Sequence, residues 1–413
     1  MRLEFVVCMR PVPYFLDTFP RTRRPDYSRH RGAIRTRVVI VGGGLTGCAC
    51  AATFATAGIP VVLLEADRIG ASATAAAPGL LRQDLDASFQ ESAAQHGVRT
   101  ARHVWQGFRR ASLDFASTLR RLNVRADLAT QDLIFFTRDG ADAARRLQRE
   151  YQARRDAGVD GSWLNARALQ SETQIAANGG IRTRGEALDP YRACLALAAA
   201  ASARGARLHE KSRVGRVRAG RKSVEIKTDR GSITADAVII ASGALIDDLK
   251  ALRRHFAPTQ SYAVVTESLP AAVRREVGKR TAALRDTAVP PHLLRWVKGD
   301  RVMFSGADEA VSSSKARERA LVPRAHQLMY ELTTLYPAIS GLQAEWAWHA
   351  VHYGSPDGLP VVGLHRNFPR HLFALGQGRH GAGVAWLAAR LLLREFLGER
   401  AKGDELFGFA RVL

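Results

Sequence analysis

Three glycines and one acidic residue near the start of the chain have the spacing of a dinucleotide-binding turn. Gly42, Gly44 and Gly47 form the pattern G-x-G-x-x-G, and Glu65 follows 21 residues after Gly44. The first glycine permits a sharp bend, the second lets the backbone approach a pyrophosphate, and the third lets a helix pack closely on a sheet. An acid at this distance can bind ribose hydroxyls, which favours FAD or NAD over NADP. The alternative is a glycine-rich turn that binds nothing.

The residues around this motif predict the strand–helix–strand unit that it requires. Residues 38–41 are a short β-branched run, typical of a buried parallel strand. Residues 48–57 are nearly all small or apolar, as expected for a helix buried against a sheet, and Gly58 and Pro60 end it. Residues 61–64 form the next strand. The N-terminus of the helix would offer N–H groups and its positive dipole end to a diphosphate.

A second glycine-rich turn lies near the end of the chain, between a strand expected at 372–375 and an apolar helix expected at 384–397. It contains three glycines and two basic residues: Gly376, Gly378, Arg379, His380 and Gly381. The basic residues stand at the mouth of the turn, where they could meet a ligand.

The segment 69–82, after the second strand, is rich in small residues. Small side chains would let the backbone lie close to a flat ring. The hydroxyls of Ser72 and Thr74 could donate to phosphate. A plain linker is the alternative.

Farther along, helical segments alternate with short strands, which indicates an α/β protein with two layers. Helices are expected at 85–122, 141–157, 190–204 and 319–335. Strands are expected at 132–137, 207–209, 215–218, 223–228, 231–234, 237–241, 260–267, 293–297 and 301–305. The strand 237–241 is apolar and ends in Ser242-Gly243-Ala244, which indicates that the chain returns there to the first sheet.

The composition excludes some classes of protein. The net charge of +22 raises the possibility of nucleic-acid binding, but the arginines are spread along all 413 residues rather than forming one stripe. A basic surface could still draw an anionic substrate to its site. No stretch approaches about 18 apolar residues, so no membrane span is expected.

The cysteines and histidines indicate neither disulfides nor a metal site. None of Cys8, Cys48, Cys50 and Cys194 forms a C-x-x-C pair, which is typical of reduced residues in a cytoplasmic protein. His349 and His352 lack an evident carboxylate or cysteine partner. Residues 1–10 lack a basic start and a small-residue cleavage site, so no signal peptide is expected there, and residues 1–35 are expected to be a surface leader.

Taken together, these segments resemble the FAD-dependent D-amino-acid oxidase superfamily, and within it the gamma-glutamylputrescine oxidoreductase branch. The resemblance extends over about residues 14–400. It rests on Tyr14-Phe-Leu-Asp-Thr, the glycine turn with Thr46, Gly185-Glu-Ala-Leu-Asp-Pro-Tyr191, Ala241-Ser-Gly-Ala244, Trp348, Asp357-Gly-Leu-Pro-Val-Val-Gly363 and the turn 376–381.

The resemblance implies a Rossmann-like FAD-binding domain with a second, mostly antiparallel-sheet α+β substrate domain. The FAD domain would be discontinuous, at 36–84, 185–250 and 346–413, and the substrate domain would hold 85–184 and 251–345. The resemblance also implies FAD, and we expect non-covalent attachment because no cysteine follows Cys194 and no histidine lies between Glu65 and Gln95. The cofactor-binding residues would be Gly42, Gly44, Gly47, Glu65, Ser72, Val214, Gly243, Asp357, Gly376, Gly378 and Gly381.

The implied reaction oxidises a C–N bond of an amine or amino acid, a small-molecule substrate. Hydride passes to the flavin and the imine hydrolyses, so the site needs an oriented amine more than an acid–base triad. Candidate catalytic residues are His380, Arg295 and Arg379, the last standing where the branch usually has glycine. A sheet-face arginine in a salt bridge is the alternative for Arg295, and a packing histidine for His380. The alternative function is a flavin-binding subunit or tailoring enzyme without amine oxidase activity.

Overall fold

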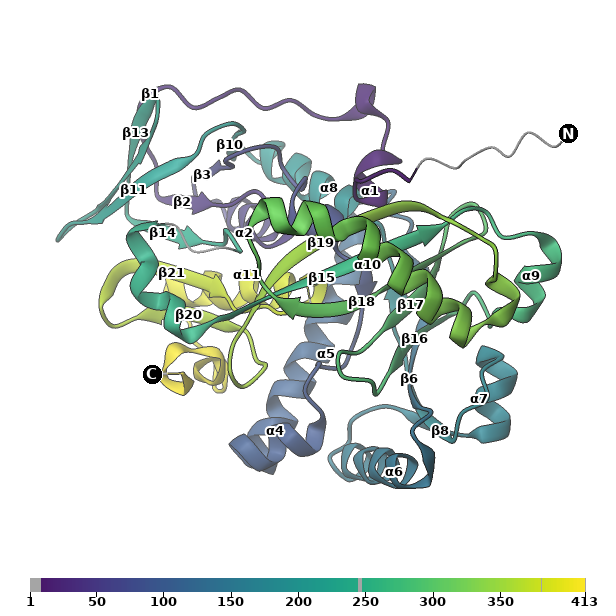
Figure 1. Ribbon diagram of the computed structural model, residues 1–413. Helices are drawn as coiled ribbons and strands as arrows, with labels where there is room; N and C mark the ends of the chain where they lie inside the picture. The colour runs from purple at the N-terminus through teal and green to yellow at the C-terminus, as the bar shows by residue number, and fades with distance from the viewer. Residues whose placement is uncertain (1–8, 244–246, 380, 413) are drawn as a thin grey trace, which may run out of the picture. The chain divides into compact units, whose positions relative to one another are not determined.

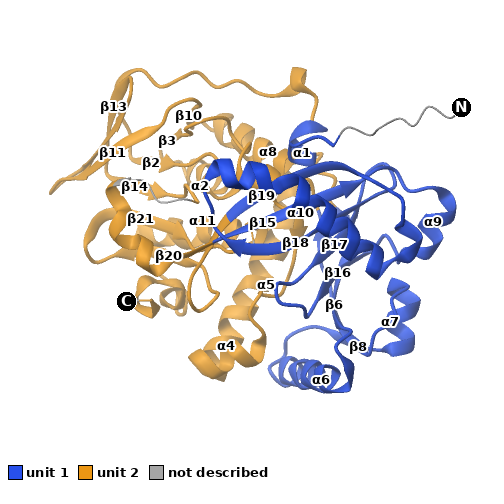
Figure 2. Cartoon of the chain, in the orientation of Figure 1, with its two compact units in different colours: residues 1–18, 129–187, 259–351 blue, residues 19–128, 188–258, 352–413 orange. Residues whose placement is uncertain are grey.

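A computed structural model describes residues 9–243, 247–379 and 381–412, which fall into two compact units (Figures 1 and 2). Unit 1 takes the chain up to residue 18 together with 129–187 and 259–351. Unit 2 takes 19–128, 188–258 and the chain from residue 352 onward. Each unit is built from segments far apart in the sequence.

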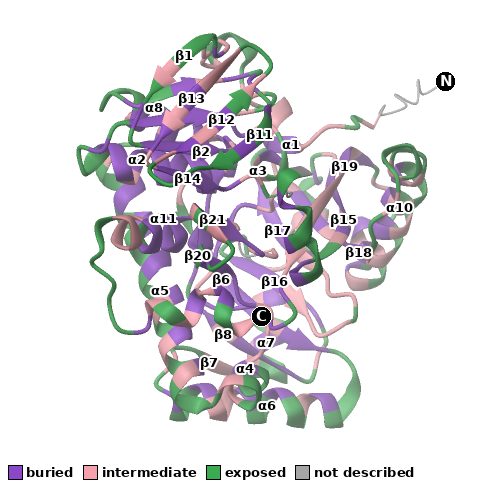
Figure 3. Cartoon of the chain, turned by 90° about the vertical axis from the view of Figure 1, so that its left-hand side faces the viewer, coloured by how far each residue is buried: buried purple, intermediate pink, exposed green. Residues whose placement is uncertain are grey.

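Unit 2 is organised around a six-stranded sheet with the order β10-β3-β2-β14-β21-β20. The strands are β10 (Arg207–His209), β3 (Val61–Leu64), β2 (Val38–Val41), β14 (Ala237–Ile240), β21 (Phe368–Leu375) and β20 (Val361–His365). The first five run parallel and β20 runs antiparallel. Every residue of β2, β3 and β14 is buried, because both faces of the sheet are covered (Figure 3).

Helices cover one face of this sheet and a second sheet covers the other. The helices are α2 (Leu45–Thr56), α8 (Pro190–Ser202), α11 (Gly381–Leu397) and α5 (Val98–Arg121), of which α2 packs against α8 and α11. The second sheet has the order β1 (Gly32–Arg35), β13 (Gly231–Ala235), β12 (Val224–Thr228) and β11 (Val214–Ala219). Its apolar side chains join those of β2 and β14 in one core.

Unit 1 is an eight-stranded, mostly antiparallel sheet covered on one face by α10 (Ser314–Leu335). In order its strands are β19 (Ala344–Gly354), β15 (Ala257–Thr266), β18 (Arg301–Ala310), β17 (Leu293–Val297), β16 (Ala282–Asp286), β6 (Asp132–Thr137), β8 (Gly179–Thr183) and β7 (Ser162–Asn165). The pair β16–β6 is parallel, whereas the pairs flanking it are antiparallel. Leu328 of α10 and Phe304 of β18 belong to the shared core.

The remaining elements are short or peripheral. They are α1 (Tyr14–Asp17), α3 (Ala73–Ala76), α4 (Phe89–His96), α6 (Gly140–Asp156), α7 (Ala166–Thr173), α9 (Ala271–Glu276), β4 (Leu80–Leu81), β5 (Ala129–Thr130), β9 (Glu186–Ala187) and the 3-10 turns η1 (Arg21–Arg23), η2 (Asp247–His255), η3 (Pro337–Ile339), η4 (Asp404–Phe407) and η5 (Phe409–Arg411). Across the described ranges, no helix is both long enough and apolar enough to span a membrane.

The division of the chain differs from the expected domain boundaries around residues 85–128. Residues 85–122 were expected to be helical and to lie in the substrate domain, but their helices α4 and α5 belong to unit 2. Gly97 separates the two helices with a φ of +82°. The α5 helix belongs to unit 2 because it packs on α11: a Cβ at Gly383 would lie 2.5 Å from Ser112 Oγ.

The N-terminal segment also differs from the expected surface leader. Tyr14 and Phe15 are buried in unit 1, where the Tyr14 ring lies edge-on to Trp346 at 5.1 Å. Residues 32–35 form β1, which pairs in parallel with β13 of unit 2. The segment therefore contributes to both units rather than lying over one domain.

Candidate functional site

The first glycine turn leaves β2 at the carboxyl edge of the parallel sheet. Gly42 has a φ of +110°, and a Cβ there would lie 2.6 Å from the carbonyl oxygen of Ala241, just after β14. A Cβ at Gly47 would lie 1.8 Å from the carbonyl oxygen of Gly42. A Cβ at Gly44 would meet only the Thr74 Oγ1, at 3.3 Å, within 4 Å. Packing therefore requires Gly42 and Gly47, whereas the outer side of Gly44 is open for a ligand to approach.

Glu65, at the end of β3, holds the same turn from the side. One carboxylate oxygen accepts a hydrogen bond from the Gly43 N–H at 2.6 Å, and the other accepts from the Asp67 N–H at 2.9 Å. A carboxylate has about four acceptor positions, so this one retains capacity for a ribose hydroxyl. The N–H of Ser212 donates to the Glu65 carbonyl at 2.8 Å, which brings the start of β11 at Val214 to this edge.

The second glycine turn meets the first. Gly376 and Gly378 both have positive φ angles, of +65° and +54°, directly after β21. Between them, the Oε1 of Gln377 accepts a hydrogen bond of 2.9 Å from the hydroxyl of Thr46 in the first turn of α2. Gln377 was not among the candidate residues, because nothing in its sequence neighbourhood identifies a partner 331 positions away.

The segment after β3 folds back over the first turn. The hydroxyl of Thr74 accepts a hydrogen bond of 2.9 Å from the Leu45 N–H, and the Gly70 N–H donates to the Gly43 carbonyl. Ser72 is exposed at the N-terminus of the short α3 helix. Of the two hydroxyls considered, Thr74 contacts the start of α2.

A buried thiol pair lies beneath the same turn. Cys48 and Cys194 have their sulfurs 3.5 Å apart, and both thiols lie within 3.6 Å of the Gly43 carbonyl oxygen. The contact with Cys194, together with burial, raises the pKa of the Cys48 thiol. Burial likewise raises the pKa of Cys50. Cys48 and Cys50 therefore stay protonated and are poor nucleophiles.

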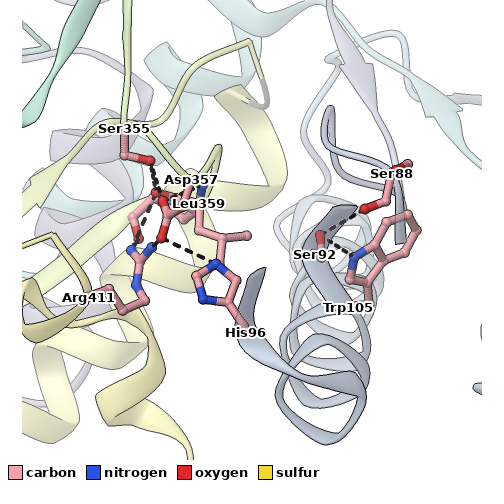
Figure 4. A network of polar contacts seen from close by, with 9 residues as sticks. Ser88, Ser92, His96, Trp105, Ser355, Asp357, Leu359 and Arg411 are labelled. Carbon is pink, nitrogen blue, oxygen red and sulfur yellow. Dashed lines mark hydrogen bonds and ion pairs between the residues drawn. The ribbon is translucent and has the colours of Figure 1, made fainter. Parts of the chain in front are cut away.

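Asp357 is engaged by partners within unit 2 (Figure 4). Its Oδ1 accepts from the Ser355 hydroxyl at 2.8 Å and from the Leu359 N–H at 3.2 Å. Its Oδ2 pairs with the Arg411 guanidinium and lies 3.5 Å from Nε2 of His96. Asp357 was expected near the flavin end. Its two carboxylate oxygens bind its own loop, Arg411 of the C-terminal segment and His96 of α4.

The basic candidates among the described residues come from both units. Arg379 is half-buried at the second turn, Gly381 begins α11 and Gly243 follows β14 with a φ of +68°, whereas His380 lies outside the described residues. Arg295 lies on β17 in unit 1 and is buried. Its guanidinium lies 5.6 Å from the Phe15 ring, and its Nε donates to the Trp296 carbonyl at 3.3 Å.

Further ionisable groups lie outside the glycine turns. In unit 1, His292 lies between Asp286 at 2.6 Å and Glu331 at 3.1 Å; burial opposes protonation, but the carboxylates prevail and its pKa is raised. Burial lowers the pKa values of His349 and His352. In the part of the chain that the structure describes, no group of three His, Cys, Asp or Glu side chains could hold a metal ion.

Comparison with known proteins identifies the family. Residues 37–394 match the family DAO, described as "FAD dependent oxidoreductase". The chain belongs to this family of FAD-dependent oxidoreductases. It is 24% identical over 378 residues to the gamma-glutamylputrescine oxidoreductase of Escherichia coli, covering 90% of this chain and 86% of that protein. It is 28% identical over 361 residues to the glycine oxidase of Geobacillus kaustophilus, covering 84% and 89%.

The solved structures agree on the fold. The crystal structure of glycine oxidase from Geobacillus kaustophilus superposes with a TM-score of 0.76 at 22% identity, covering 91% of this chain and 98% of that one. The resemblance to the D-amino-acid oxidase superfamily and the expected two-part α/β fold class are therefore confirmed. The family implies FAD, and unit 2 has features that fit it: the open side of Gly44, the first turn of α2 and the spare acceptor positions of Glu65.

Proposed function

We propose that the protein uses non-covalently bound FAD to oxidise a C–N bond of an amine or amino acid. The observation that supports this best is the junction of the two glycine turns at the carboxyl edge of the parallel sheet, joined by Thr46 and Gln377. Ligands of open α/β sheets bind at this edge. Two relatives that align over most of the chain are named glycine oxidase and gamma-glutamylputrescine oxidoreductase, which supports the substrate class.

Each part of the dinucleotide site has a task in this proposal. The first turn of α2 and the open side of Gly44 bind the pyrophosphate, and Glu65 binds the ribose. Val214 and Gly243 border the adenine side and the middle of the site, and Ser72 lies near the phosphates. Bound FAD supplies an acceptor for the hydride of the carbon next to nitrogen.

In this proposal the second glycine turn binds the flavin end of the cofactor. The backbone N–H groups after Gly376, Gly378 and Gly381 stabilise negative charge there through the N-terminal end of α11. Arg379, His380 and Arg295 bind and orient the substrate, and the imine product leaves to hydrolyse in water. Asp357 contributes only by holding its own loop in place, because its carboxylate oxygens are already bound by groups of unit 2.

Non-covalent attachment is supported by two thiols of α2, those of Cys48 and Cys50. Covalent flavin links require a reactive cysteine or histidine. Cys48 and Cys50 are buried with raised pKa values, and the sequence has no cysteine after Cys194.

The test is an anaerobic visible spectrum recorded while amines and amino acids are added one at a time. Bleaching of the flavin band by one of them would support the proposal and name the substrate class. A yellow protein that no compound bleaches would favour a flavin-binding subunit or tailoring enzyme instead.

Substitutions then test the substrate anchor. Arg295→Ala should raise the substrate concentration for half-bleaching roughly 10- to 100-fold, because a charge-assisted hydrogen bond contributes about 1.5–3 kcal/mol. Arg182→Ala, on strand β8 of the same sheet and ion-paired with Glu172, is the matched control and should change little.

A further inference from the structure

The helix α8 has an outer face of methyl groups. Its inner residues are buried against the unit 2 core. The outer face carries Ala196, Ala199, Ala200 and Ala203, of which Ala199 and Ala203 are exposed. A surface helix normally places charged or polar side chains on such a face. Apolar surface is therefore left open to solvent here.

A hollow of about 670 Å³ lies against this face. Its other walls come from the segment 19–25 and from residues 122–125, which follow α5. This volume is within the range of sites that take small organic molecules, about 300–1,000 Å³. None of the residues of the two glycine turns lines it, so the hollow is separate from the candidate dinucleotide site.

The polar groups of the hollow are positively charged. Its lining includes four arginines and no acidic residue: Arg23, Arg125, Arg192 and Arg204. Among the described residues, only Arg192 of these is ion-paired, with its Nε 3.1 Å from Asp189 and 3.9 Å from Asp127. These two carboxylates leave an excess of positive charge, which favours an anion in the hollow.

One of these guanidinium groups is already held in place. The Nε of Arg192 donates to Asp189 Oδ2 at 3.1 Å, and its guanidinium carbon lies 5.3 Å from the Phe19 ring. Phe19 in turn lies edge-on to the buried Tyr191 at 5.4 Å. The Nη groups of Arg192 make no hydrogen bond within the described ranges, so two donors in a fixed plane remain for a ligand. A planar pair of N–H donors suits a carboxylate.

We propose that this hollow binds a small organic carboxylate with an apolar body. The carboxylate takes the Nη groups of Arg192, and the apolar body covers Ala196 and Ala200 on the outer face of α8. Arg125 and Arg204 add long-range attraction. Neither charge nor apolar surface alone accounts for the lining, whereas a ligand with both parts matches it.

The test is calorimetric titration of the full-length protein with octanoate as the probe. Acetate supplies the charge without the apolar body, and octanamide supplies the body without the charge. Octanoate should bind at least about tenfold more tightly than either, since both parts of the ligand contribute. Octanamide binding as tightly as octanoate, or no octanoate binding at all, would overturn the proposal.

Variants locate the site. Arg192→Gln should weaken octanoate binding about tenfold or more, since it removes a charged donor pair. Ala199→Glu, at an exposed helix position, should abolish it by placing a carboxylate in the hollow without disturbing packing. Arg218→Gln, an exposed arginine of β11 outside the hollow, is the matched control and should bind as the parent does. Equal affinity of the parent and Ala199→Glu would place the octanoate elsewhere and refute the assignment.

Discussion

Two glycines of the first turn, Gly44 and Gly47, should respond differently to the same added methyl group. Gly44→Ala places its Cβ 3.3 Å from Thr74 Oγ1, whereas Gly47→Ala places it 1.8 Å from the Gly42 carbonyl oxygen. The first change fits the folded backbone as it stands, whereas the second requires the backbone to move. Together they separate what the fold requires from what a ligand requires.

The expected magnitudes follow from these distances. Gly44 has a φ of −73°, which alanine adopts freely, so Gly44→Ala should change the free energy of unfolding by about 1 kcal/mol or less. Contacts below 3.0 Å essentially do not occur, so Gly47→Ala must move the turn or the helix by about 1.2 Å. Overpacking of this kind costs about 1–3 kcal/mol, and we expect a value near 3 kcal/mol because the clash is with backbone.

FAD binding should show the opposite order: among folded molecules, Gly44→Ala should weaken FAD binding more than Gly47→Ala does. In the proposed site, the methyl group of Gly44→Ala would stand where the pyrophosphate approaches, and losing one charge-assisted hydrogen bond would weaken FAD binding roughly 10- to 100-fold. Thermal unfolding of the FAD-free proteins and fluorescence titration with FAD measure the two effects separately. A Gly44→Ala protein that binds FAD as well as the parent would refute the assignment of this turn. A Gly47→Ala protein as stable as the parent would refute the packing argument.

Three further outcomes are expected. Asp357→Asn should lower the free energy of unfolding in urea by about 3 kcal/mol, because it leaves Arg411 without its buried partner, whereas Asp114→Asn, in an exposed pair, should change it by less than about 1 kcal/mol. The pKa of His292 is raised above its ordinary 6.5, so its stabilising charge is complete below pH 6.5 and is lost as the pH rises through the folded-state pKa. His292→Gln should therefore flatten that part of the curve of unfolding free energy against pH. An unchanged curve would contradict this assignment. Acid precipitation of the yellow protein should leave the flavin in the supernatant, and flavin in the pellet would show a covalent link.

Local patterns predicted much of the fold. The expected bounds of β6 and β17 match the structure, because apolar runs flanked by turn residues define strands without long-range information. Asp189 caps α8, with its carboxylate accepting from the Arg192 N–H at 3.0 Å, and an aspartate followed by proline is a local signal for a helix start. The glycine motif could also be predicted from the sequence, since its residues all lie within one strand–helix unit.

Features that depend on distant partners could not be predicted. The sequence predicted a helix in the region of α5, but it could not show that α11 packs against that helix. The family resemblance placed Asp357 at the flavin end, but the sequence could not show that its carboxylate pairs with Arg411, which lies 54 positions away. Gly97 was overlooked because a glycine inside a helical pattern can either be tolerated or end the helix.

The strand order of the six-stranded sheet has a consequence for how the protein is made. β2 takes β14 as its neighbour, and β14 takes β21, although these strands come from the start, middle and end of the chain. A ribosome adding 5–20 residues per second needs roughly 10–40 s to reach β14 after completing β2. During that interval β2 has an unpaired, fully apolar edge, the kind of surface that pairs with other chains. Protection of the nascent chain is therefore most needed before residue 240 emerges, and a chain truncated before β21 would keep such an edge permanently.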